Sequence, residues 1–197
     1  YRSAKTPVNH NNYIGMPMAI LAMSEDTEVA VLEMGMNHFR EMAYLSGIGQ
    51  PDVAVIVNIG TMHIEHLGSQ EGILQAKLEI LEGMEPTAPV LLNGDDKYLK
   101  TARCGEHPVT YFGVGENCTV RGLDPEIATG CVSFRVKAGE QEFAVELPVE
   151  GEHFVCDALA AVAVGLQLGV EPVKIQKSLG NFQNMAGRQE IYEKNGY

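Results

Sequence analysis

The chain has 197 residues, 45% of them hydrophobic and 20% charged, which is enough to bury one sizeable core in a globular protein. Its 26 acidic residues outnumber its 14 basic residues and give a formal net charge of -12, which argues against nucleic-acid binding through phosphate neutralisation. No apolar run approaches the length of a membrane span, so we expect a cytoplasmic protein with no membrane insertion.

The first half of the chain alternates short apolar runs with stretches of helical spacing. The strand candidates are residues 29–32, 52–58, 88–93 and 108–113. The first three are apolar on both faces, as parallel strands covered by helices must be. Residues 39–47 and 70–83 lie between these runs and predict helices. Strands separated by helices predict an α/β fold with a doubly wound, mainly parallel sheet and helices on both faces.

The second half changes character. Residues 117–150 contain runs that alternate with period two, with Gly130 and Gly139 in the connections, and this pattern predicts a small antiparallel β-meander attached to the parallel sheet. Helices are expected at 154–168 and 171–179. We expect residues 1–187 to form one domain. Residues 188–197 would be a linker and the start of a further domain.

Polar side chains follow the predicted parallel strands. Glu33 ends the first, His63 follows the second, and Asn93 and Asp95 end the third. Ligands of open α/β sheets bind at the carboxyl ends of the strands, so Glu33 and His63 could ligate a divalent metal. A carboxylate suits Mg²⁺, whereas imidazole is more typical of Zn²⁺ or Mn²⁺. The alternative is that polar residues gather at any strand end.

Other polar residues allow two interpretations. Asn9, Asn11 and Asn12 form a loop before a helix, where asparagines cap helices and build turns or contact a ligand. Lys77 lies one turn into a predicted helix and by itself indicates a solvated surface lysine. The four cysteines form no C-x-x-C pair, so neither a zinc signature nor a dense disulfide framework is expected.

An ordered set of motifs resembles the central, ATP-binding domain of the Mur ligase family, most closely the MurF type. The matching blocks are residues 6–17, 33–45, 51–69, 76–80, 92–96, 151–161 and 187–188. Each block alone is weak, but their order along nearly the whole chain is specific. The resemblance implies a P-loop NTPase-like fold. It also implies that ATP phosphorylates the carboxylate of UDP-N-acetylmuramoyl-tripeptide and that the amine of D-alanyl-D-alanine then forms an amide.

The resemblance also implies the residues of the site, with ATP and Mg²⁺ as cofactors. In the family, the positions of Glu33 and His63 hold magnesium, and the position of Lys77 carries a carbamate that supports the metal site. These three are therefore the expected catalytic and metal-binding residues. The asparagines at positions 9, 11 and 12 are expected on the muramoyl-peptide side.

The resemblance further implies that four other residues contact the nucleotide, namely Asn93, His153, Asp157 and Arg188. The family often has asparagine where this chain has Phe154 and Asp157. An asparagine amide both donates and accepts, whereas an ionised aspartate only accepts, which puts an adenine contact by Asp157 in question.

The Gly-rich phosphate loop and the carboxy-terminal domain of the family do not occur in this sequence. We therefore expect a fragment that is inactive without the rest of its protein. The alternatives are another ligase of this kind, such as a third-residue-adding, folylpolyglutamate or cyanophycin synthetase, or a non-catalytic nucleotide-binding scaffold. A scaffold would not need Glu33, His63 and Lys77 together.

Overall fold

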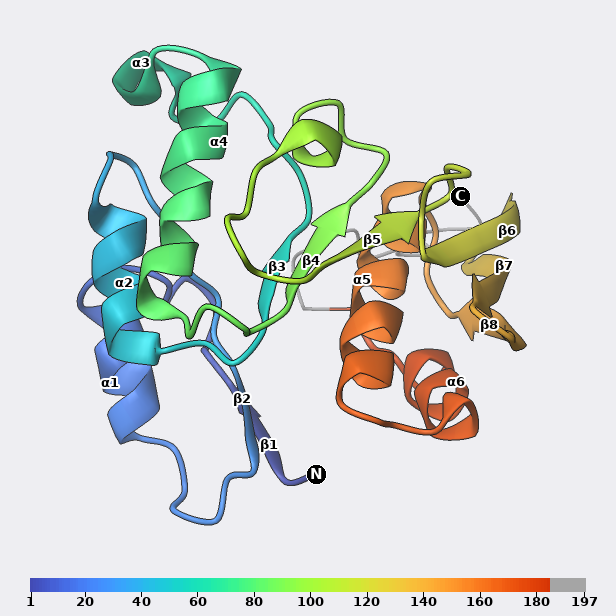
Figure 1. The fold of residues 1–197 in the computed structure, drawn as a ribbon. Coiled ribbons are helices and arrows are strands. Elements are labelled where there is room, and N and C mark those ends of the chain that lie inside the picture. The colour runs from blue at the N-terminus through green and yellow to red at the C-terminus, as the bar shows by residue number, and fades with distance from the viewer. Residues whose placement is uncertain (185–197) are drawn as a thin grey trace, which may run out of the picture. The chain divides into compact units, whose positions relative to one another are not determined.

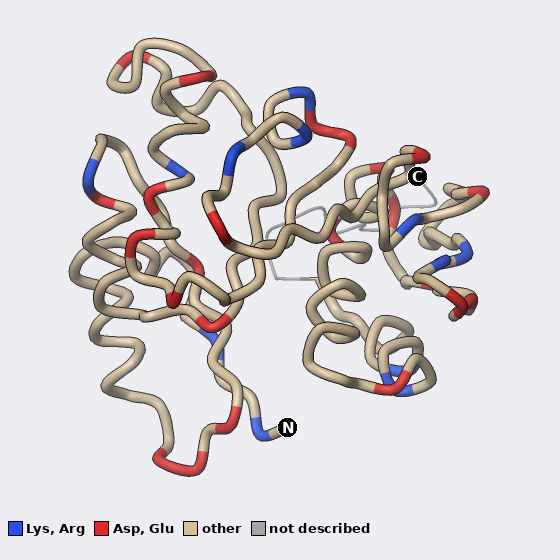
Figure 2. Tube along the Cα trace, in the orientation of Figure 1, with Lys and Arg blue, Asp and Glu red and all other residues tan. Residues whose placement is uncertain are grey.

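The computed structural model describes residues 1–184 and divides the chain into two compact units between Tyr111 and Phe112 (Figure 1). We call these unit 1 and unit 2. Charged residues are spread over the loops and helices of both units (Figure 2). Arg188 and the predicted linker at 188–197 lie outside the described residues.

Unit 1 contains parallel strands separated by helices. Its elements are β1 (Ser3–Lys5), α1 (Gly15–Leu21), β2 (Val29–Val31), α2 (Glu41–Gly49), β3 (Ala54–Ile56), α3 (Ile64–Leu67), α4 (Gln70–Leu78), the 3-10 helix η1 (Glu79–Gly83), β4 (Val90–Asn93) and the 3-10 helix η2 (Leu99–Thr101). Parallel pairs form between β1 and β2 and between β3 and β4. The strand β1 was not predicted, and the predicted helix 70–83 divides into α4 and η1.

The core of unit 1 lies around β3 and β4. All four residues of β4 are buried, as its continuous apolar run predicts for a covered parallel strand. Helix α4 buries Ile73 and Ala76. This helix begins where the Ser69 hydroxyl accepts the N–H of Gly72 at 3.1 Å and so satisfies one of the free donors of the first turn. The loops at the strand ends are thus attached to well-packed strands and to α4.

Unit 2 contains the antiparallel meander. The strand β5 (Val109–Gly113) spans the division between the units, and its last two residues pair in parallel with β6 (Val120–Ala128). Strands β6, β7 (Cys131–Ala138) and β8 (Gln141–Leu147) pair in antiparallel fashion. Gly130 and Gly139 have φ angles of 72° and 60° in the two connections, a conformation that favours glycine. Both hairpins therefore turn where the sequence predicts.

Two helices complete unit 2. Helix α5 (His153–Gln167) buries an apolar face that contacts β6 and β7, and α6 (Pro172–Gly180) contacts β8. Their bounds agree within one residue with the predicted helices. With the parallel strands and helices of unit 1, they confirm the α/β class. In residues 1–184 no helix is long and apolar enough to cross a membrane, and none of the four cysteines forms a disulfide.

Candidate functional site

A cavity of about 590 Å³ lies in unit 1, next to the first turn of α2. We call it the α2 cavity. It is lined by Asn11, Asn12, Tyr13, Gly35, Met36, Asn37, Phe39, Arg40, Glu41, Tyr44, Leu45 and His63. Its volume is typical of a site for a small molecule, and its wall combines aromatic rings with a few polar groups, as such sites usually do.

Glu33 and Asn11 are held together at the edge of this cavity. The Nδ2 of Asn11 donates to Glu33 Oε1 at 2.8 Å, and the backbone N–H of Glu33 donates to the hydroxyl of buried Thr6 at 2.9 Å. The Gly35 N–H donates to the Asn11 carbonyl at 2.7 Å. A Cβ on Gly35 would lie only 3.0 Å from Asn11 Cγ, so glycine permits the close approach. The predicted carboxylate and asparagine thus form one group.

The other two asparagines of the loop behave differently. The Asn12 side-chain oxygen accepts the N–H groups of Ile14 at 3.0 Å and Gly15 at 2.8 Å, just before α1. Asn12 therefore builds the turn into the helix while it also lines the α2 cavity. Asn9 is exposed and has a φ of 62°, which asparagine tolerates better than most residues. Asn9 does not line this cavity.

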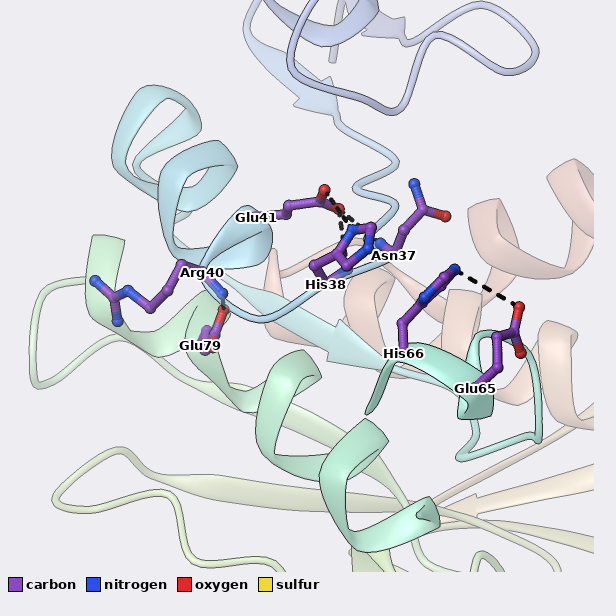
Figure 3. Close-up of polar contacts among 7 residues, drawn as sticks. All are labelled: Asn37, His38, Arg40, Glu41, Glu65, His66 and Glu79. Carbon is purple, nitrogen blue, oxygen red and sulfur yellow. Dashed lines mark hydrogen bonds and ion pairs between the residues drawn. The ribbon is translucent and has the colours of Figure 1, made fainter. Parts of the chain in front are cut away.

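His63 ends the loop that follows β3 and lines the α2 cavity. Its φ of 63° is left-handed, and within residues 1–184 its ring makes no hydrogen bond. Three residues later, His66 is exposed, and its ring lies 4.5 Å from that of His38 between centroids. The Nδ1 of His38 lies 3.2 Å from a carboxylate oxygen of Glu41 (Figure 3). His66 therefore contacts the segment before α2 through His38 and does not line the cavity.

Lys77 is partly buried rather than a solvated surface lysine. Its ammonium donates to the carbonyl of Asn58 at 2.7 Å, just beyond β3. Burial lowers the pKa of Lys77, and the charge of Asp96 opposes this effect to a smaller extent. Asp96 in turn accepts the N–H of Ile59 at 2.8 Å. The carboxyl ends of β3 and β4 thus meet around this lysine.

Asn93 is buried at the end of β4 and serves the backbone. Its Nδ2 donates to the carbonyl of Val57 at 2.9 Å, and its Oδ1 accepts the N–H of Asp95 at 2.9 Å. These bonds fix the same loop that presents Asn58 to Lys77. Asn93, which was predicted to contact the nucleotide, therefore uses its side chain to bond the backbone of this loop.

The candidate site residues of unit 1 thus form two separate clusters of polar side chains. Asn11 and His63 line the α2 cavity and Glu33 is bonded to Asn11, whereas Lys77 and Asn93 lie at the end of β3. In the described part of the chain, no hydrogen bond or ion pair joins Glu33, His63 and Lys77 to one another. Within the same residues, no cluster of three or more His, Cys, Asp and Glu side chains is arranged to hold a metal. A metal set that includes Lys77 is therefore a proposal.

The predicted nucleotide residues of unit 2 lie on α5. His153 is the first residue of this helix, and its ring lies 4.3 Å from that of Phe154. Burial raises the pKa of the Asp157 carboxyl, and the charge of His153 lowers it by less. Both residues keep an exposed surface. The fourth predicted residue, Arg188, lies outside the described residues.

Sequence reasoning missed several residues of the cavity wall. Phe39, Arg40 and Tyr44 line the cavity, and although they fall within the matching block 33–45, no site role had been assigned to them. The aromatic rings have large exposed fractions, 40% for Phe39 and 57% for Tyr44, but that signal appears only once the fold is known. Buried Glu79, which contacts the backbone of Arg40, was also missed.

Comparisons with known proteins agree with this architecture. The family model described as "Mur ligase middle domain" matches residues 1–165. The UDP-N-acetylmuramoyl-tripeptide--D-alanyl-D-alanine ligase of Bacillus subtilis is 38% identical over 191 residues, which is 97% of this chain and 41% of that protein. A crystal structure of MurF from Acinetobacter baumannii is 34% identical with a TM-score of 0.92, over 98% of this chain and 43% of that one.

A further solved structure is the MurF ligase from Thermotoga maritima in complex with ADP. It is 28% identical with a TM-score of 0.86, over 99% of this chain and 45% of that one. The chain thus spans less than half the length of each of these relatives. Since the family model matches well over half of its residues, the chain belongs to the Mur ligase middle domain family.

Proposed function

We propose that this chain is the central, ATP-binding domain of a cytoplasmic ligase that adds D-alanyl-D-alanine to UDP-N-acetylmuramoyl-tripeptide during peptidoglycan precursor synthesis. The observation that carries the proposal is the 38% identity to the Bacillus subtilis ligase of that name over 97% of the chain. The likeness to MurF of Acinetobacter baumannii supports it. The proposed domain comprises residues 1–187, and residues 188–197 lead into the next domain.

The proposed reaction has two steps. The γ-phosphoryl group of ATP passes to the terminal carboxylate of the muramoyl tripeptide, which gives an acyl phosphate and ADP. The amine of D-alanyl-D-alanine then attacks the acyl carbon, phosphate leaves, and the amine loses a proton as the amide forms. Two anions must approach each other in the first step, so the protein has to place them accurately and offset their charge.

The donors in unit 1 fit a magnesium ion in part. Glu33 is exposed, and one of its carboxylate oxygens accepts from Asn11, which leaves the other oxygen available. His63 lines the α2 cavity, and within residues 1–184 its ring has no hydrogen-bond partner. Bound Mg²⁺ would neutralise charge between phosphate and carboxylate oxygens. We assign Glu33 and His63 as its ligands, and Asn11 as the residue that orients the carboxylate.

Lys77 is proposed to complete this set as a carbamate. Its neutral amine would add to CO₂ and lose a proton, which converts a cation into an anion beside the metal. The pKa of Lys77 is lowered by burial, which raises the fraction of neutral amine that the reaction needs. The hydrogen bond to the Asn58 carbonyl holds the side chain at the end of β3. Burial therefore favours the modification.

The two substrates are proposed to bind on different residues. The α2 cavity, with Asn11 and Asn12 in its wall, would receive the peptide side of the muramoyl substrate, and Asn9 lies in the same loop. ATP would contact the nucleotide residues named above, Asn93, His153, Asp157 and Arg188. The ADP bound to the Thermotoga maritima MurF ligase supports a nucleotide site in this family. As an acceptor only, Asp157 would contact the ribose or a donor of adenine.

The test is ligation by the complete protein that contains this chain. Phosphate release and amide product are measured with ATP, Mg²⁺, UDP-N-acetylmuramoyl-tripeptide and D-alanyl-D-alanine. We expect both products, and neither when the dipeptide is omitted. A parallel reaction offers a diamino acid and the muramoyl dipeptide. Turnover of that pair alone would identify a third-residue-adding ligase, and no turnover of either would refute the assignment.

A further inference from the structure

Glu79 is a buried carboxylate two residues beyond Lys77. Its exposed fraction is 8%, and one of its oxygens accepts the backbone N–H of Arg40 at 2.7 Å (Figure 3). A carboxylate loses much of its hydration on burial, so its placement needs a firm partner. Here the partner is the backbone just before α2, 39 residues away in the sequence.

Arg40 has an unusual backbone. Its φ of 72° is left-handed, a conformation that costs a residue other than glycine about 1 kcal/mol or more. The same residue lines the α2 cavity. Such a conformation persists only where the surroundings hold it. The bond to Glu79 is the contact that holds this N–H.

The residues around Arg40 form the cavity wall. A carboxylate oxygen of Glu41 accepts the N–H groups of Asn37 at 2.6 Å and His38 at 3.3 Å, so this segment is fixed at its other end as well. Met36, Asn37, Phe39, Arg40 and Glu41 all face the cavity. A shift of the backbone at Arg40 would therefore move this part of the wall.

The remaining contacts of Arg40 are weaker anchors. Its guanidinium pairs with Glu82 at 2.6 Å, but the two side chains are 71% and 47% exposed. Exposed ion pairs contribute little because solvent and salt screen them. The ring contact between His38 and His66 also lies among exposed residues. Of the two carboxylates that contact Arg40, Glu79 is thus the one less screened by solvent, and it is the acceptor of the Arg40 N–H.

We propose that Glu79 is a positioning residue for substrate binding in the α2 cavity. Through the backbone of Arg40, it ties the helical segment that carries Lys77 to the cavity wall formed by residues 36–41. This inference rests on the proposed function, since it assigns the cavity to the muramoyl peptide. Glu79 does not itself line the cavity.

The expected consequence is selective. Without the carboxylate, the N–H of Arg40 loses its acceptor and the backbone can relax from its left-handed conformation. The wall then recedes from the substrate, while residues outside it keep their positions. Affinity for the muramoyl peptide therefore falls, and affinity for ATP does not.

The test uses the complete ligase with Glu79→Ala, Glu79→Gln and, as a matched control, Glu82→Gln. The control removes a charge from the same 3-10 helix and a contact with the same arginine, but leaves the Arg40 N–H bonded. For Glu79→Ala we expect KM for the muramoyl tripeptide to rise about tenfold, with KM for ATP changed less than about twofold. Glu79→Gln keeps a carbonyl acceptor and should fall between. Glu82→Gln should match the wild type.

A second comparison separates positioning from stability. Glycine adopts a positive φ without strain, so the Glu79→Gln substitution should raise KM less in an Arg40→Gly background than in the wild-type background. Equal effects in both backgrounds would overturn the proposal, as would a wild-type KM in Glu79→Ala. This comparison decides the matter even where Glu79→Ala does not fold. A wild-type enzyme that fails to ligate would instead refute the proposed function.

Discussion

The two units use polar side chains in different ways. In residues 1–184, the buried polar or charged side chains are Thr6, Ser46, Glu79 and Asn93, and all four belong to unit 1. Unit 2 places its charged pairs on the surface, as in the contacts of Arg135 with Asp124 and Glu142. A buried polar group destabilises a fold unless it is bonded. Unit 1 buries polar side chains and gives each a hydrogen-bond partner, whereas unit 2 keeps its charged pairs at the surface.

The four buried groups share one kind of partner, which is a backbone atom near the candidate site. Thr6 accepts the N–H of Glu33, Glu79 accepts that of Arg40, Asn93 donates to the carbonyl of Val57, and Ser46 donates to that of Ile80. Glu33 and Arg40 belong to the candidate site or its cavity, and Val57 precedes Asn58, which accepts from Lys77, whereas the Ser46 bond joins α2 to η1. The comparison teaches that buried polarity in this protein serves to position loops.

The largest expected effect tests whether unit 1 carries the chemistry. In the complete ligase, Lys77→Ala should lower kcat by about 100-fold or more, because it removes the anion proposed beside the metal. Added formate or acetate should restore part of the rate by supplying a carboxylate. Lys100→Ala, which removes an exposed lysine of the same unit, should stay close to wild type. Undiminished turnover in Lys77→Ala would remove this residue from the site.

The next effect concerns the packing of unit 1. A Cβ on Gly83 would overlap the backbone of Ser46, so Gly83→Ala should destabilise the protein by roughly 1–3 kcal/mol. The matched control is Gly47→Ala, since Gly47 lies in α2 with open space around it. Alanine there should stabilise by roughly 0.5 kcal/mol. Chemical denaturation measures both, and equal stabilities would contradict the close contact between α2 and η1.

Much of the fold could be predicted from the sequence because its signals are local. Strand runs such as 88–93 and the helix near 154–168 depend on apolar spacing, which is visible in one dimension. The strand β1 was not predicted because Ser3–Lys5 is short and contains a single apolar residue, whereas the equally short β2 is entirely apolar. The break between α4 and η1 left no glycine or proline signal at the junction of Leu78 and Glu79.

The candidate site could be predicted only in part. Glu33 and His63 follow strands, so their position at strand ends is visible in the sequence. Lys77 gained its importance from the family resemblance, since a lysine in a helix usually indicates a solvated surface. Glu79 lies in the matching block 76–80, but nothing in the sequence indicated its burial, because that depends on contact with Arg40 from a distant segment. Interactions between segments far apart in the chain are what a single sequence does not reveal.

A smaller effect tests Asp157, the carboxyl within residues 112–184 whose pKa is raised by burial. A carboxyl with a raised pKa binds more protons in the folded state, so its contribution to stability is present at low pH and is lost as the pH rises above its ordinary value of 3.8. Asp157→Asn should therefore lose less stability than wild type between pH 3.8 and 7. Melting temperatures across this range measure the difference.

The control for that prediction is Glu152→Gln, which removes one exposed negative charge immediately before α5. It separates the desolvation of Asp157 from a general change of net charge. If both variants show the same pH profile, the burial of the Asp157 carboxyl has no energetic consequence. The difference between the units would then be larger, because the partly buried carboxyl of unit 2 would have no measurable effect on stability.

The smallest effect is expected from the surface pairs of the meander. Arg135→Ala removes both contacts of Arg135, but solvent screens them, so the melting temperature should fall by no more than about 1–2 °C and ligation by the complete enzyme should be unchanged. Phe134→Ala, which truncates a buried ring next to it on β7, should destabilise far more. A larger loss from Arg135→Ala than from Phe134→Ala would show that unit 2 also depends on precise polar contacts, and the distinction between the units would fail.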